Sequence, residues 1–233
     1  MARILLLETS TARLSVALAQ DGVAVASRSC AEPRQQASLT APMVKEVLDS
    51  LSLTMQDCDA VCVSKGPGSY TGLRVGVSTA KGLAFGARLP LIAIGTLDVL
   101  VAPVIHAAPV ILSEAKNLSA IIPMIDARRM EVYTAVFGPD GIQRTPVEAK
   151  VIGPDSFAEE LAAGPVLFVG DGALKCREVL THPNAFFQEA WPDAADMAAA
   201  AEAAYHEKRF EDLAYFEPFY LKDFIATVSK KPW

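Results

Sequence analysis

The stretch from residue 60 to residue 86, AVCVSKGPGSYTGLRVGVSTAKGLAFG, contains the unit that decides the fold. Residues 60–64 are a short apolar run typical of a buried strand. Residues 65–72 follow as a loop rich in glycine and proline, and residues 73–85 read as a helix that ends at Gly86. A buried strand, a loop and a helix in this order indicate an α/β protein.

Three strands and a helix precede this unit. Residues 3–8, 13–19 and 23–29 read as a meander, and the pair Asp21-Gly22 favours a hairpin turn because both residues tolerate positive φ. Residues 38–51 carry apolar side chains at helical spacing. The first part of the chain is therefore expected to form strands backed by helices.

One more strand, residues 91–94, follows the unit, and Thr96 begins a further helix. The resulting order is strand, strand, strand, helix, strand, helix, strand. This order is similar to the repeating unit of the actin, Hsp70 and sugar-kinase (ASKHA) architecture. We therefore expect an α/β, two-lobed ASKHA-like fold with mixed sheets flanked by helices.

The boundary between the lobes is expected in residues 102–120, a weakly patterned stretch that two prolines interrupt. Residues 1–105 then form the N-terminal lobe, joined by the C-terminal segment of about 212–233, and residues 106–211 form the second lobe. The elements expected in the second lobe are strands at 121–125, 131–137 and 166–169 and helices at 155–163 and 194–208.

Composition and charge limit the classes of partner. The chain has 233 residues and a net charge of −6, and Lys and Arg never occur in runs longer than two, so we expect no strong direct binding to a nucleic-acid backbone. The apolar run at residues 4–7 is too short for a signal-peptide core or a membrane span. Cys58 and Cys62 lie in or beside an apolar run and read as buried thiols, which fits a reducing cytoplasm.

Searches for a catalytic or metal-binding pattern are negative. His106, His182 and His206 are isolated from one another, and neither HxxxH nor HExxH occurs. No GxSxG is present to indicate a nucleophile. We therefore predict no catalytic residue and no metal ligand.

Two loops could hold a phosphate if the chain bound a nucleotide. The first follows the strand 3–8 and contains an acidic residue and small hydroxyls; the second lies before the helix 73–85, where free backbone N–H groups favour anions. The second loop lacks the Gly-Lys-Ser/Thr ending of a P-loop and the spacing of GxGxxG, so a plain structural turn stays an alternative. The candidate residues are Glu8, Thr9, Ser10, Gly66, Pro67, Gly68, Ser69, Tyr70, Thr71 and Arg74.

Small residues recur every four positions on the helix that follows this second loop. Such a strip lets another element approach closely, either the chain's own sheet or a helix of a partner. The intermolecular interpretation would also use the apolar stripe of the helix 38–51. The candidate interface residues are Leu39, Met43, Val47, Gly72, Leu73, Gly76, Val77, Ala80, Lys81 and Ala84.

Four stretches resemble the TsaB (YeaZ) family. They are ILLLETSTARLSVAL at 4–18, GPGSYTGLR at 66–74, DARRMEVY at 126–133, and EPFYLK at 217–222, where Lys222 replaces the family's arginine. The related catalytic TsaD family carries His-x-x-x-His on the first helix of its N-terminal lobe, whereas residues 35–45 here contain no histidine.

This resemblance implies a cytoplasmic, non-catalytic subunit. Such a subunit binds the TsaD transferase in threonylcarbamoylation of the adenosine next to the anticodon of tRNA. The resemblance also implies the ATPase TsaE as a third component, a homodimer through the same helices, and tRNA contact only through the complex. We expect no cofactor bound by this chain itself, and ATP or ADP at the complex interface stays an alternative. The alternative is an actin-like ATPase or phosphotransferase that acts on its own.

Overall fold

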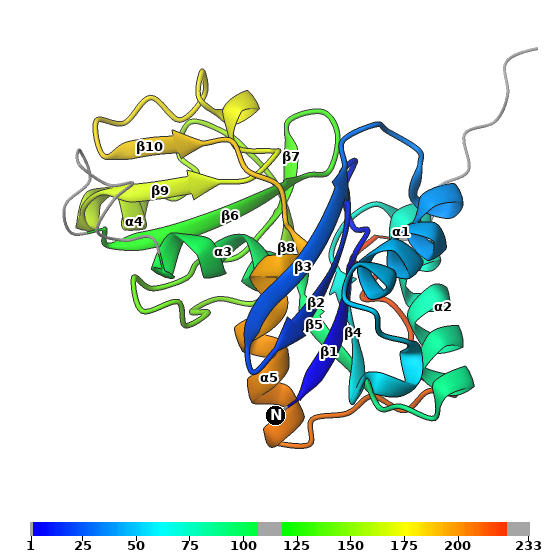
Figure 1. Ribbon diagram of the computed structural model, residues 1–233. Helices are drawn as coiled ribbons and strands as arrows, with labels where there is room; N and C mark the ends of the chain where they lie inside the picture. Colours follow the sequence, from blue (N-terminus) through cyan, green and yellow to red (C-terminus); the bar gives the residue numbers. More distant parts are fainter. Residues whose placement is uncertain (1, 107–117, 223–233) are drawn as a thin grey trace, which may run out of the picture.

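The computed structural model of the protein describes residues 2–106 and 118–222. Two sheets, each flanked by helices, lie side by side (Figure 1). The first part of the chain contains β1 (Arg3–Glu8), β2 (Leu14–Gln20), β3 (Val23–Cys30), α1 (Gln36–Ser50), β4 (Ala60–Gly66), α2 (Tyr70–Ala87), β5 (Leu91–Gly95) and α3 (Thr96–His106). The second part contains β6 (Ala120–Asp126), β7 (Glu131–Thr134), β8 (Glu148–Val151), α4 (Ala158–Ala163), β9 (Val166–Val169), β10 (Ala185–Gln188) and α5 (Ala198–His206), with the short 3-10 turns η2 (Leu174–Cys176) and η3 (Ala194–Met197).

The two sheets have the same topology. The first has the order β3-β2-β1-β4-β5, and the second has the corresponding order β8-β7-β6-β9-β10. In each, a three-stranded antiparallel meander continues into two parallel strands. The expected α/β fold with mixed sheets is confirmed, and the chain contains a structural repeat that the sequence does not display.

Both faces of the first sheet are covered. On one face α1 and α2 pack over a core that includes Leu5, Leu7 and Val63. On the other face η3 and α5 pack over Leu6 and Cys62. A strand covered on both sides needs apolar residues at successive positions, which explains why β1 and β4 read as continuous apolar runs.

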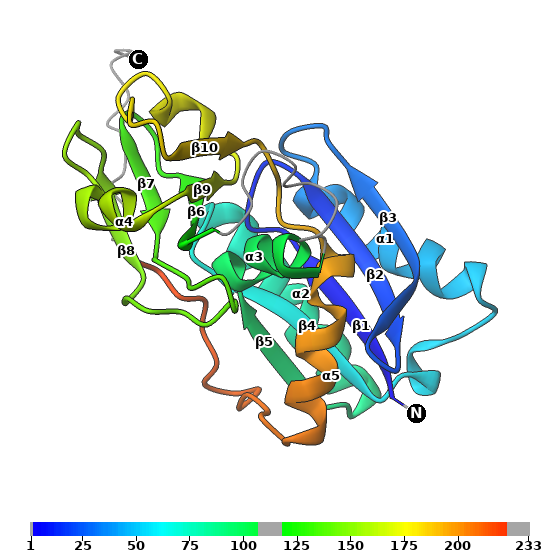
Figure 2. The same ribbon diagram turned by 90° about the vertical axis from the view of Figure 1, so that its left-hand side faces the viewer.

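The helix α3 contributes to the packing of both sheets. Its Val99 lies in the core of the first sheet, whereas Leu97, Leu100 and Val101 pack against the second sheet. Figure 2 shows α3 between the two sheets. This helix therefore lies between the lobes and packs against both sheets.

Two placements differ from the sequence expectation. The helix α5, expected in the second lobe, packs on the first sheet through Ala198, Ala201 and Ala204. An alanine face is flat and fits any sheet, so the sequence does not say which sheet it covers. The short strands β8 and β10 had no expected counterpart in the sequence analysis.

Two helices begin a few residues earlier in the structure than the sequence predicts. The helix α1 begins at Gln36 rather than 38, which places Pro42 inside it. The helix α2 begins at Tyr70 rather than 73, and the Ser69 hydroxyl caps it by accepting from the Gly72 N–H.

Within the described ranges, no helix is long and apolar enough to cross a membrane.

Candidate functional site

The two loops that sequence reasoning singled out lie against each other. The Thr9 hydroxyl donates to the Gly72 carbonyl oxygen over 2.8 Å, and the Ser69 N–H donates to the Ser10 carbonyl oxygen over 2.6 Å. The tip of the β1–β2 hairpin is thus fastened to the first turn of α2. These bonds stabilise the first lobe and occupy polar groups that a phosphate would otherwise use.

Close approach explains the small residues at the start of α2. A Cβ atom added to Gly72 would collide with the Thr9 carbonyl oxygen, and one added to Gly76 would collide with the Thr9 hydroxyl. Ala80 and Ala84 continue the same face and are completely buried. The strip therefore packs within the chain, which is the first of the two interpretations that the sequence left open.

Most of the candidate interface residues are part of this internal packing. Met43, Val47, Leu73 and Val77 are at most 6% exposed and belong to the chain's own core. Lys81 donates to the carbonyl oxygens of the C-terminal segment. Of the candidate set, Leu39 and Lys81 stay partly exposed. A docking surface on these helices must therefore use their opposite face. Helical periodicity shows that one face of a helix is apolar, but it does not show whether the chain's own core or a partner covers that face.

The outer face of α2 has an unusual composition. Gly82 and Gly86 lie on it, and a Cβ atom added to either would meet no atom within 4 Å. Phe85 lies beside them and is 78% exposed. Glycine in the interior of a helix costs about 1 kcal/mol relative to alanine. No contact within the described chain accounts for this cost at Gly82, whereas Gly86 lies in the last turn of α2.

The other candidate loop residues differ in exposure. Glu8, Thr9 and Ser10 are buried, as are Gly66 and Pro67. Gly68 and Tyr70 are half-buried, whereas Ser69, Thr71 and Arg74 are exposed. The Arg74 guanidinium lies 5.5 Å from the centre of the Tyr70 ring.

Glu8 is a completely buried carboxyl group at the end of β1. Its Oε1 accepts from the Ser10 N–H over 2.6 Å, while its Oε2 has no hydrogen-bond partner. Burial, with a smaller contribution from the charge of Asp193, raises the pKa of Glu8 to about 7, although the Ser10 N–H and the Ser10 and Ser64 hydroxyls act to lower it. Neither hydroxyl makes a hydrogen bond of normal geometry. Glu8, Ser10 and Ser64 therefore each have a buried side-chain oxygen without a hydrogen-bond partner.

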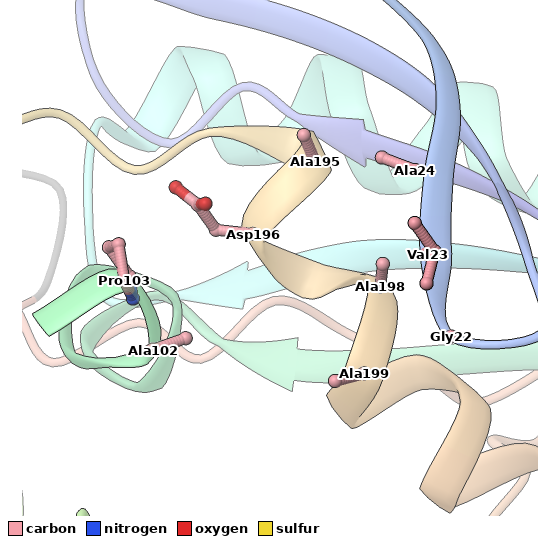
Figure 3. A pocket seen from close by; sticks show the side chains of 9 residues that line it. All are labelled: Gly22, Val23, Ala24, Ala102, Pro103, Ala195, Asp196, Ala198 and Ala199. Carbon is pink, nitrogen blue, oxygen red and sulfur yellow. The ribbon is translucent and has the colours of Figure 1, made fainter. Parts of the chain in front are cut away.

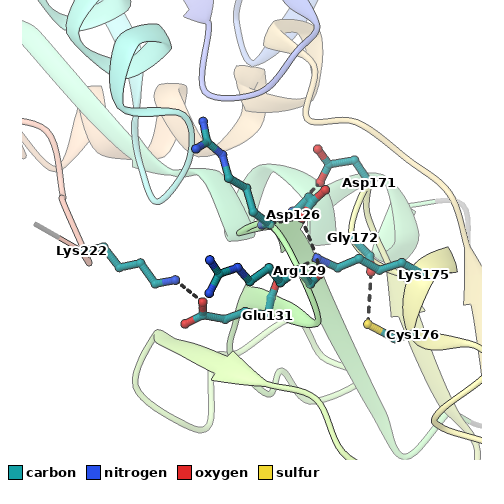
Figure 4. A network of polar contacts seen from close by, with 9 residues as sticks. Asp126, Arg129, Glu131, Asp171, Gly172, Lys175, Cys176 and Lys222 are labelled. Carbon is teal, nitrogen blue, oxygen red and sulfur yellow. Dashed lines mark hydrogen bonds and ion pairs between the residues drawn. The ribbon is translucent and has the colours of Figure 1, made fainter. Parts of the chain in front are cut away.

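The segment 126–133 contains the end of β6, the β6–β7 turn and the first residues of β7. Lys175 supports it by donating to Asp126 Oδ1 over 2.5 Å and to the carbonyl oxygens of Arg129 and Glu131 over 2.8 and 2.7 Å (Figure 4). Arg128 and Arg129 both have positive φ, 69° and 53°.

The same turn is fastened to a second acidic residue. The Asp126 N–H donates to Asp171 Oδ1 over 2.9 Å, and burial raises the pKa of Asp171. Sequence reasoning found this turn as a motif but missed Lys175 and Asp171, which come from a distant part of the chain.

A groove of about 450 Å³ lies where the β2–β3 turn, α3 and η3 meet (Figure 3). Its lining is apolar apart from Asp196, whose carboxylate points toward α3. The lining residues are Gly22, Val23, Ala24, Ala102, Pro103, Ala195, Asp196, Ala198 and Ala199. The sequence gives no signal for this groove, because its residues come from three separate segments.

The cysteines and histidines form no chemical centre in the described ranges. Cys58, Cys62 and Cys176 are free and buried, as expected for the first two, and burial raises the pKa of each thiol. No group of three or more His, Cys, Asp or Glu side chains there could hold a metal ion. His106 has no described side chain, so its expected isolation lies outside the described residues.

The comparisons with known proteins agree with the motifs. A family model described as tRNA N6-adenosine threonylcarbamoyltransferase (TsaD) matches residues 31–229. The Escherichia coli K12 protein named tRNA threonylcarbamoyladenosine biosynthesis protein TsaB is 30% identical over 232 residues, which cover 96% of each chain. The chain belongs to the TsaB (YeaZ) family.

Further relatives support this membership of the TsaB family. The Haemophilus influenzae protein of the same name is 31% identical over 96% of this chain and 94% of its own length. The structure described as YeaZ from Pseudomonas aeruginosa is 28% identical, covers 95% of this chain and 100% of its own, and has a TM-score of 0.79. The expected two-lobed ASKHA-like fold is thereby confirmed.

Proposed function

We propose that the chain is a non-catalytic scaffold subunit in the threonylcarbamoylation of tRNA adenosine next to the anticodon. In this role it docks on a TsaD-type transferase through the outer face of α2. The printed names of its relatives and the matching family model support a place in this pathway. Within residues 2–106 and 118–222, the lack of a cluster of ligating side chains supports an accessory role.

The observation that carries the proposal is the outer face of α2. Gly82 and Gly86 leave open space above the helix, and Phe85 is exposed between them. Small residues at this spacing let a second helix approach closely, and an exposed aromatic side chain is a common anchor of an interface. A partner helix packed here would explain the glycine at position 82, in the interior of α2 on its exposed face.

The helix α1 extends the same side of the lobe. It lies beside α2 on the same face of the first sheet (Figure 1), and its Leu39 is only partly buried. Lys45, Glu46 and Asp49 are exposed charged residues further along the same helix. An apolar centre with a charged rim is the usual anatomy of a protein interface.

A capture experiment tests the docking surface. Gly82→Arg places a long charged side chain on the outer face of α2, where no atom of the chain obstructs it. We expect capture of the purified transferase to fall about tenfold or more, since a charge at an interface centre must be desolvated. Gly153→Arg is the matched control, because Gly153 is equally unobstructed but lies before α4 in the second lobe. Equal capture of the Gly82→Arg variant and the parent would refute the docking surface.

The same surface is proposed to form a homodimer when the transferase is absent. Phe85→Asp should lower the dimer fraction in sedimentation experiments, because a charged side chain would replace the exposed aromatic ring. A monomer–dimer equilibrium identical to that of the parent would place any self-association elsewhere.

The proposal includes the remaining members of the complex. A TsaE-type ATPase completes it, ATP or ADP binds at the complex interface, and tRNA contacts this chain only through the assembly, in the cytoplasm. The net charge of −6 supports the last point about tRNA. Calorimetry with ATP and magnesium on the isolated chain tests the alternative, since tight binding and turnover without the transferase would indicate an independent ATPase.

A further inference from the structure

The C-terminal strap, residues 213–222, is anchored to the first lobe. Lys81 of α2 donates to the Phe216 carbonyl oxygen over 3.0 Å and to the Ala214 carbonyl oxygen over 3.4 Å. Leu213 and Phe216 pack against the core below α1 and α2. These contacts place the start of the strap firmly on α2.

The middle of the strap follows the loop before α2. The Phe219 N–H donates to the Lys65 carbonyl oxygen over 2.7 Å. The Tyr220 ring lies 4.9 Å from the Tyr70 ring, measured between centroids, at the first residue of α2. The strap is therefore held to the first lobe along most of its length.

The end of the strap crosses to the second lobe. The Lys222 ammonium group pairs with the Glu131 carboxylate of β7 and lies 5.8 Å from the centre of the Tyr133 ring. Figure 4 shows Lys222 reaching toward Glu131, and Figure 2 shows the strap running from the end of α5 to the second lobe. Two residues after Tyr220, the strap therefore contacts the second lobe through the Lys222 side chain.

Two of the contacts between the lobes, the packing at α3 and the ion pair of the strap, differ in strength. At α3 the connection is apolar and buried, since Leu97, Leu100 and Val101 are each 1% exposed. At the strap it is an ion pair whose side chains are 37% and 23% exposed. A partly exposed ion pair contributes little free energy and is weakened by salt, whereas buried apolar packing contributes much more.

We propose that residues 213–222 are a releasable latch between the lobes, which Lys222 closes on Glu131. When the pair opens, the buried packing at α3 stays intact and the lobes turn about that helix. An acidic group that competes for Lys222, or a basic group that competes for Glu131, releases the latch. The latch does not depend on which partner docks on the outer face of α2.

Distance measurements between the lobes test the latch. Spin labels are attached at Ala41→Cys in α1 and Glu159→Cys in α4, both exposed positions, in a Cys30→Ser background that removes a half-buried native thiol. We expect one narrow distance distribution in this parent and a roughly twofold broader one after Lys222→Met, because the lobes then sample more orientations. The charge exchange Lys222→Glu with Glu131→Lys should restore the narrow distribution.

Two comparisons complete the experiment. Lys150→Met removes an ion pair of similar exposure within β8 and should leave the distribution unchanged. Sodium chloride at about 1 M should broaden the distribution of the parent but not that of the Lys222→Met variant, because it screens the pair. An unchanged distribution in the Lys222→Met variant, or a parent that does not respond to salt, overturns the proposal.

Discussion

The Thr9 hydroxyl, at the tip of the β1–β2 hairpin, donates a buried 2.8 Å hydrogen bond to the Gly72 carbonyl oxygen in the first turn of α2. This contact joins two segments that are 63 residues apart. It fixes the inward face of α2, because the glycines at 72 and 76 let Thr9 approach the helix. The outward face, with Gly82, follows from the same contact.

Two alanine substitutions on α2 should have opposite effects. Gly76→Ala forces a Cβ atom into the Thr9 hydroxyl and should lower the free energy of unfolding by about 1–3 kcal/mol. Gly82→Ala adds a methyl group in open space and should raise it by about 0.5–1 kcal/mol, since alanine favours the helix. Urea unfolding of both variants measures the difference. A Gly76→Ala variant as stable as the parent would show that α2 is not tightly seated on the hairpin.

Removing the charge of Glu8 should change the pH dependence of stability. Glu8 has a pKa of 4.5 in the unfolded chain, which burial raises to about 7 in the folded protein. Between these pH values the unfolded chain loses a proton that the folded protein keeps, so stability falls as pH rises through this window. The total loss is about 3 kcal/mol and persists above pH 7.

Glu8→Gln should remove this loss, because the amide keeps an acceptor for the Ser10 N–H and carries no charge. Unfolding in urea at about pH 4.5 and about pH 8 measures the effect as a difference between parent and variant. The gain from Glu8→Gln is expected at the higher pH only. A gain of equal size at both pH values would contradict the shifted pKa.

Lys81→Met should destabilise the protein although the position was a candidate for a partner interface. The ammonium group donates to two carbonyl oxygens of the strap, and its loss should cost about 1–2 kcal/mol. Lys45→Met is the control, because Lys45 is exposed and pairs with Asp49 of the same helix, so its loss should cost less than about 0.5 kcal/mol. Equal stability of the two variants would show that Lys81 does not anchor the strap.

Thiol labelling should separate Cys30 from the other three cysteines. Cys30 is half-buried at the end of β3, whereas Cys58, Cys62 and Cys176 are buried and have raised pKa values. Mass spectrometry after a short exposure to a thiol reagent should therefore find a single modified site. Cys30→Ser should abolish this fast modification, and rapid labelling of Cys62 in the native protein would contradict the packing of the first sheet.

The sequence by itself determined the elements of the first lobe. β1 was expected at residues 3–8 and found there, because a strand covered on both faces is a continuous apolar run between polar residues. The small residues of α2 also predicted a close approach by another element. Both patterns can be read from the sequence, because they depend only on residues that are close together in the chain.

The tertiary structure decided what approaches each face. It placed Thr9 against Gly72, α5 on the first sheet rather than the second, and Lys222 beside Glu131. These contacts join residues far apart in the chain, and no local pattern encodes the partner. An amphipathic pattern shows that one face of a helix is buried, but only the packing of the whole chain decides which surface covers that face and which face stays exposed.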